Sequence, residues 1–113
     1  MIIIAFSNKT SKIIPQLLCC KLKHVAPIVP HNNKLIMYQF VSPRHTEKII
    51  LQMRDIKILQ SHGWKFVYVD GAAMPHDFDS YNAYSCVDLT KHAVGMKNWR
   101  IQTPCALYKI LNN

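Results

Sequence analysis

Acidic residues are scarce in this sequence, which has six Asp and Glu residues against 14 Lys and Arg residues. The resulting formal charge of +8 favours an anionic neighbour such as nucleic acid, lipid head groups or an acidic protein face. The basic residues are scattered, however, and form no run interleaved with aromatic residues, as nucleic-acid surfaces often do. The composition therefore indicates a solvated basic face and disfavours a dedicated nucleic-acid-binding protein.

The chain also lacks a hydrophobic run long enough to cross a membrane. Its opening residues, MIIIAF, are too few to span a bilayer. They have neither the charged start nor the cleavage site of a secretory signal. We therefore expect no transmembrane segment and a protein made in the cytoplasm.

Cysteine motifs are missing as well. Cys19 and Cys20 are neighbours, which almost never suit disulfide geometry, so together with Cys86 and Cys105 they form no paired extracellular framework. No Cys-x-x-Cys pair occurs, and the histidines outside residue 24 lack ligand spacing: His31, His45, His62, His76 and His92. The sequence predicts a reducing compartment, no structural metal and no cofactor.

The 113 residues suffice for one compact core, so we expect a single domain over residues 1–113. Apolar runs, turn formers and cap residues predict the elements in chain order. These are a strand at 2–6, a helix at 11–20, a hairpin of 24–29 with 35–41, extended structure over 48–59, a strand in GWKFVYVD, a helix from Cys86 to Val94 ended by Gly95, and a last helix with Thr103 as N-cap. This order predicts an α+β fold with a mostly antiparallel sheet.

Cys86 is the candidate nucleophile, because the first turn of a helix has free N–H groups and a dipole that stabilise a thiolate. A nucleophile needs a base and a group that orients the base. His24 opens the predicted hairpin and Gln39 lies on its partner strand, so both could lie beside Cys86. The N–H of Cys86 and a hydroxyl of Tyr81 or Tyr84 could bind a developing oxyanion.

Four segments carry a resemblance, in this order: HVAPIV, LIMYQF, YSCVDLTKHAVGM and TPCALYKIL. Together they resemble the circularly permuted NlpC-type branch of the papain-like superfamily, which includes YiiX-like and lecithin-retinol-acyltransferase-like proteins and many small phage proteins. The resemblance covers nearly the whole chain and implies Cys86 as nucleophile, His24 as base and Gln39 as the orienting group. At Gln39 the chain departs from the more usual carboxylate or histidine, and an amide cannot stabilise an imidazolium by charge.

Two functions of different classes follow. The first is a cysteine hydrolase or acyltransferase that acts on an amide or ester bond, with peptidoglycan peptides as the substrate class that the resemblance implies. The second is a phage virion or accessory protein that keeps the scaffold for docking to partner proteins and leaves the thiol unused. Nucleic-acid binding through the basic surface is a third. For single residues, a packing role for Cys86 and a dipole role for Asp88 near the helix start are the simpler interpretations.

Overall fold

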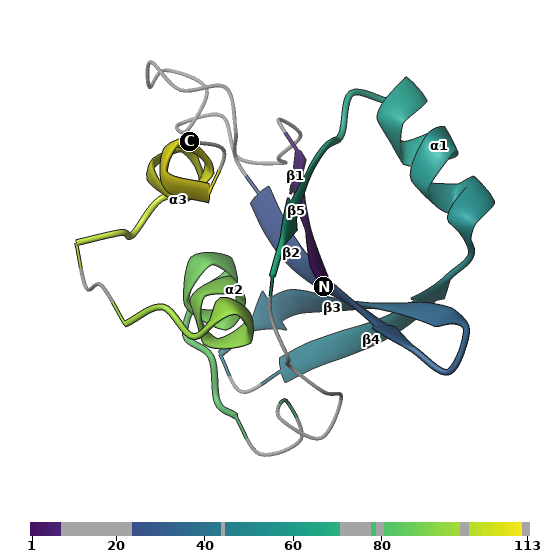
Figure 1. The fold of residues 1–113 in the computed structure, drawn as a ribbon. Coiled ribbons are helices and arrows are strands. Elements are labelled where there is room, and N and C mark those ends of the chain that lie inside the picture. The colour runs from purple at the N-terminus through teal and green to yellow at the C-terminus, as the bar shows by residue number, and fades with distance from the viewer. Residues whose placement is uncertain (8–23, 44, 71–77, 79–80, 98–99, 112–113) are drawn as a thin grey trace.

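The computed structural model describes residues 1–7, 24–43, 45–70, 78, 81–97 and 100–111. The helix predicted over 11–20 lies outside these residues. The described elements are β1 (Ile2–Ser7), β2 (His24–His31), β3 (Lys34–Ser42), β4 (His45–Leu51), α1 (Met53–Ser61), β5 (Lys65–Val69), α2 (Cys86–Val94) and α3 (Pro104–Leu111). Figure 1 shows one sheet with α1 on one side and α2 and α3 on the other.

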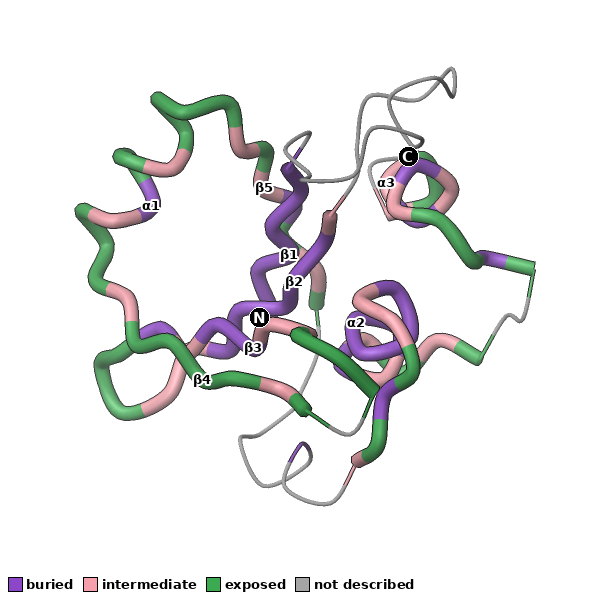
Figure 2. Tube along the Cα trace, turned by 180° about the vertical axis from the view of Figure 1, so that it is seen from behind, coloured by how far each residue is buried: buried purple, intermediate pink, exposed green. Residues whose placement is uncertain are grey.

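The five strands form one sheet in the order β4-β3-β2-β1-β5, and every neighbouring pair is antiparallel. The α+β fold with a mostly antiparallel sheet is therefore confirmed. β1 lies between β2 and β5, and all its residues are buried, as its unbroken run of β-branched and apolar side chains predicts. Figure 2 shows this burial concentrated in β1 and β2.

The predicted hairpin is formed by β2 and β3. Its two turn residues, Asn32 and Asn33, have φ angles of 50° and 64°, in the left-handed region that a two-residue hairpin turn requires. Asparagine tolerates this region because its short polar side chain hydrogen-bonds locally. The β2–β3 register runs only from His31 opposite Lys34 to Ile28 opposite Met37, whereas β3 pairs with β4 from Leu35 to Ser42.

The expectation of extended structure over 48–59 is correct only as far as Leu51. The chain turns into α1 at Gln52, whose backbone N–H donates to Asp55 Oδ2 at 2.8 Å, and this bond stabilises the first turn. Ile56 is buried and Leu59 is half-buried, and both pack on the sheet. The helical spacing of these two residues outweighs the alternation that precedes it.

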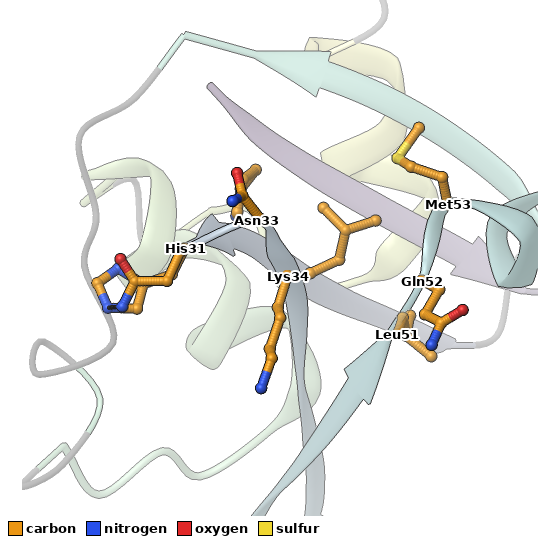
Figure 3. A pocket seen from close by; sticks show the side chains of 9 residues that line it. His31, Asn33, Lys34, Leu51, Gln52 and Met53 are labelled. Atoms are coloured by element: carbon orange, nitrogen blue, oxygen red, sulfur yellow. Dashed lines mark hydrogen bonds between the residues drawn. The ribbon is translucent and has the colours of Figure 1, made fainter.

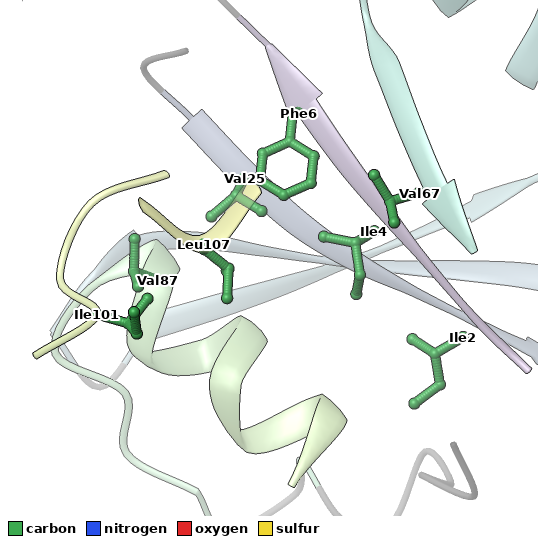
Figure 4. Packing of buried hydrophobic residues seen from close by; sticks show 8 residues of the cluster. All are labelled: Ile2, Ile4, Phe6, Val25, Val67, Val87, Ile101 and Leu107. Carbon is green, nitrogen blue, oxygen red and sulfur yellow. The ribbon is translucent and has the colours of Figure 1, made fainter. Parts of the chain in front are cut away.

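Side chains of the sheet alternate between two apolar layers. The α2-side cluster lies between the sheet and helices α2 and α3 (Figure 4), and its members are Ile2, Ile4, Phe6, Val25, Val67, Val87, Ile101 and Leu107. The α1-side cluster lies on the other face and consists of Ile3, Ala5, Ala26, Ile28, Leu35, Met37 and Ile56. The assignment of each residue to a face decides which side chains can meet.

The C-terminal helices form where the sequence predicts them. α2 ends at Gly95, whose φ of 73° is the left-handed conformation of a glycine cap. α3 begins at Pro104, and Thr103 Oγ1 accepts a hydrogen bond from the Ala106 N–H at 3.1 Å. No described helix is both long enough and apolar enough to cross a membrane.

Candidate functional site

Cys86 occupies the first position of α2, as predicted. Ser85 is the N-cap, and its Oγ accepts a hydrogen bond from the Asp88 N–H at 3.0 Å. The Cys86 side chain is half-buried and packs against the α2-side cluster. The Ser85 cap thus sets the residue at which α2 begins, and this start places the Cys86 thiol in the first turn of the helix.

The environment of the Cys86 thiol favours its neutral form. Burial raises its pKa and is the largest effect, whereas the backbone N–H groups of Val25, Val87 and Cys86 itself lower the pKa by a smaller amount. The net shift is upward, because desolvation of a thiolate outweighs the nearby amide dipoles. The helix start therefore does not produce the reactive thiolate that the sequence suggested.

The His24 ring lies on the other face of the sheet. Val25 belongs to the α2-side cluster and Ala26 to the α1-side cluster, so strand alternation places His24 on the face of Ala26. Its ring meets the ring of Trp64 edge-on, with centroids 6.3 Å apart, and Trp64 packs against the α1-side cluster. The backbone at Val25 approaches the Cys86 thiol while the neighbouring imidazole points away, so the predicted Cys86–His24 pair is not formed.

Gln39 lies on β3 opposite Glu47 of β4. It is two residues from Met37, a member of the α1-side cluster, so alternation places its side chain on that same face and away from Cys86. The structure therefore brings neither the proposed base nor the proposed orienting group to the thiol.

The two tyrosines do not form an oxyanion site either. The Tyr81 hydroxyl donates to Asp88 Oδ1 and Oδ2, each at 2.9 Å, so its proton is already engaged. The Tyr84 side chain is 60% exposed, and its backbone N–H donates to Asp88 Oδ2 at 3.3 Å. Both tyrosines thus anchor the segment that enters α2, and their common acceptor is a buried carboxylate.

Sequence reasoning missed this cluster around Asp88. The Tyr81 ring stacks on His92 of α2 with centroids 3.7 Å apart and an interplanar angle of 6°. Phe78 meets the edge of His92 and stacks on Tyr38 of β3 at 4.0 Å. The spacing of Asp88 and His92, four residues apart on one helix face, was the signal that could have found it.

The pKa of Tyr81 is raised to about 12. Burial is the first cause, followed by the hydrogen bond to Asp88 and by the negative charge of that carboxylate. The phenol therefore remains a hydrogen-bond donor over the whole physiological range. The cluster therefore stabilises the packing of the segment 81–85 against α2.

Cys105 corrects a second expectation. It is disulfide-bonded, whereas Cys86 is a free thiol. The expectation was that the four cysteines form no paired extracellular framework, and the bond at Cys105 shows that at least one of them is paired.

Acid should destabilise the protein through His24. Burial lowers its pKa below the ordinary value of 6.5, and its Nε2 has no hydrogen-bond partner among the described residues. Because the folded state disfavours the imidazolium, His24 of the unfolded chain is protonated at a higher pH than His24 of the folded protein. The free energy of unfolding therefore falls as the pH drops from about 6.5 through the lower pKa of the folded state.

We expect His24→Phe to flatten this acid limb in urea unfolding followed at several pH values, because phenylalanine keeps the ring contact with Trp64 and cannot be protonated. The exposed His62, changed to Phe, is the control and should leave the limb as it is. Equal acid sensitivity in the wild type and in His24→Phe would contradict the burial of an uncharged ring.

Comparison with models of protein families, with curated proteins and with solved structures returned no match. Among the described residues, no group of three His, Cys, Asp or Glu side chains is placed to hold a metal ion.

Proposed function

We propose that this protein is a docking module that retains a papain-like sequence pattern without using its cysteine for acyl transfer. The proposal follows the second of the two functions that the sequence raises, a virion or accessory protein that binds partner proteins. The observation that carries it is an edge strand, β4, in which no residue is buried. An uncovered edge strand that also exposes two isoleucines, Ile49 and Ile50, is a surface suited to association.

Two observations weigh against acyl transfer at Cys86. Alternation along β2 turns the His24 ring to the face opposite the thiol, so the proposed base is not within reach of the sulfur. Burial also keeps the thiol protonated by raising its pKa. A half-buried cysteine that packs on an apolar cluster and has a raised pKa is a poor nucleophile.

Alkylation with iodoacetamide near neutral pH, read by mass spectrometry of peptides, tests the inert thiol. Cys86 should react more slowly in the folded protein than in the urea-unfolded chain, because the raised pKa lowers the fraction of thiolate and burial limits access to the sulfur. Cys105 should react only after reduction of its disulfide.

The control variant for this experiment is His24→Ala. Because the two side chains lie on opposite faces, removal of the imidazole should leave the Cys86 rate unchanged. Rapid labelling of Cys86 that is lost in His24→Ala would contradict the proposal and restore the hydrolase.

Selection of a displayed peptide library on the immobilised protein tests docking itself. Selected peptides should bind Cys86→Ala as well as they bind the wild type, because the thiol plays no part. They should lose binding to the double variant Ile49→Thr, Ile50→Thr, which removes apolar surface from β4 and keeps a residue suited to strands. Peptides that lose binding to Cys86→Ala and keep binding to the β4 double variant would contradict the docking function.

A further inference from the structure

The two edges of the sheet differ in how they are covered. At one edge, β5 lies beside α3, and the Lys65 ammonium lies 5.7 Å from the centroid of the Tyr108 ring on that helix. At the other edge, β4 has five exposed and two half-buried residues. An edge strand presents a row of unpaired N–H and C=O groups to any strand that approaches. β4 is therefore the more open edge.

Apolar side chains line both faces of β4. Ile49 lies opposite Met37 and points to the α1 side, whereas Ile50 lies opposite Ile36 and points to the other side. Their exposed fractions are 36% and 62%. In a strand added beside β4, side chains on one face would pack on Ile49 and side chains on the other face would pack on Ile50.

The end of β4 is cationic. Lys34 begins the neighbouring strand, and Arg54 and Lys57 lie in the first turns of α1, directly after β4. None of these three forms an ion pair within the described part of the chain. Two carboxylates lie in the same segments: Glu47, which lies 3.7 Å from His45, and Asp55, which accepts the Gln52 N–H.

A pocket of about 460 Å³ continues from this end of β4. Figure 3 shows Leu51, Gln52 and Met53 on one side of it and Asn33 and Lys34 on the other. The pocket lies between the β2–β3 turn and the junction of β4 with α1. It offers amide groups, an ammonium group and apolar surface to that segment.

We propose that β4 docks an extended, acidic segment of a partner protein by strand addition, with its carboxylates at Lys34 and Arg54. The inference rests on the docking function above and adds the surface and the chemistry of the partner. A second copy of this chain is the poorer occupant, because each copy carries a formal charge of +8 and two copies repel. An acidic partner is attracted by the same charge.

The test is an NMR titration of isotope-labelled protein with a short capped peptide of alternating Glu and Val. A peptide of alternating Lys and Val is the matched control for charge, and a backbone N-methylated version of the acidic peptide is the control for strand pairing. We expect the acidic peptide to change the chemical shifts of the β4 amides. The Lys peptide should bind at least about tenfold more weakly, and binding of the acidic peptide should weaken as salt is added. Arg54→Glu should weaken the acidic peptide, and Ile50→Thr should weaken it without unfolding the protein, because both side chains are exposed.

Each other outcome overturns the inference in a distinct way. Equal binding of both peptides at β4 would contradict the preference for an acidic partner and leave the docking function intact. A dimer that forms through β4 at raised protein concentration would likewise contradict the acidic partner and leave the docking function intact. Binding of the N-methylated peptide excludes strand addition. Shifts away from β4, or no binding while Cys86 stays unreactive, exclude this surface. Failure of the docking function itself would appear separately, as rapid, His24-dependent alkylation of Cys86.

Discussion

Replacing Asp88 with alanine should lower the free energy of unfolding by about 2–4 kcal/mol, because its carboxylate is the acceptor for two buried or half-buried donors. The Tyr81 hydroxyl and the Tyr84 N–H would lose their partner, and α2 would lose a negative charge in its first turn. Urea unfolding followed by circular dichroism measures the loss.

The matched control for this prediction is Asp55→Ala. Asp55 caps the first turn of α1 in a comparable position, but its hydrogen bond to the Gln52 N–H is exposed to solvent. Its loss should cost only about 1 kcal/mol. Equal costs at the two positions would show that the cluster around Asp88 is no more than an ordinary helix cap.

Tyr81→Phe examines the same cluster more finely. It removes one hydroxyl and keeps the ring that stacks on His92, so it should cost less than Asp88→Ala. An ultraviolet titration of the tyrosines should also lose the component that ionises at about 12. A titration curve unchanged in this variant would contradict the hydrogen bond to Asp88.

Leu107→Ala should lower the free energy of unfolding by about 2–5 kcal/mol, the range for large-to-small changes in a packed core. Leu107 has no exposed surface and is the fully buried residue of α3 in the α2-side cluster (Figure 4). The loss combines the transfer energy of the missing methyl groups with the cavity that they leave. Urea unfolding again measures it.

Ile110→Ala is the control on the same helix. Ile110 is 45% exposed, so its truncation should cost under about 1 kcal/mol. Similar small costs for both variants would mean that α3 does not pack on the sheet through Leu107.

The elements that the sequence predicted are those with strong local signals. α2 begins at Cys86 and ends at Val94 as expected, because Ser85 is a good N-cap and Gly95 a good terminator. α1 was not expected, because glutamine at position 52 is a weak cap signal and the residues before it alternate as in a strand. The helix with clear capping residues was thus predicted correctly, and the helix without them was not.

The site failed to follow from the sequence for a different reason. Residues 25–29 of β2 are all buried, so both faces of that strand are apolar and the pattern shows no alternation. A strand buried on both sides does not tell which face His24 takes, and only the structure shows that Val25 faces α2. The disulfide at Cys105 was missed because spacing alone does not give cysteine connectivity.

The place where β2 and β3 separate coincides with Pro27, the residue directly before the last paired position, Ile28. Proline has no N–H to donate, so the ladder could not continue there without an unmet carbonyl on the neighbouring strand. Leu89 and Ala93 of α2 pack with Val29 of β2 and Tyr38 of β3 beside this point of separation. The helix that carries Cys86 therefore lies over the part of the sheet in which the β2–β3 ladder ends at Pro27.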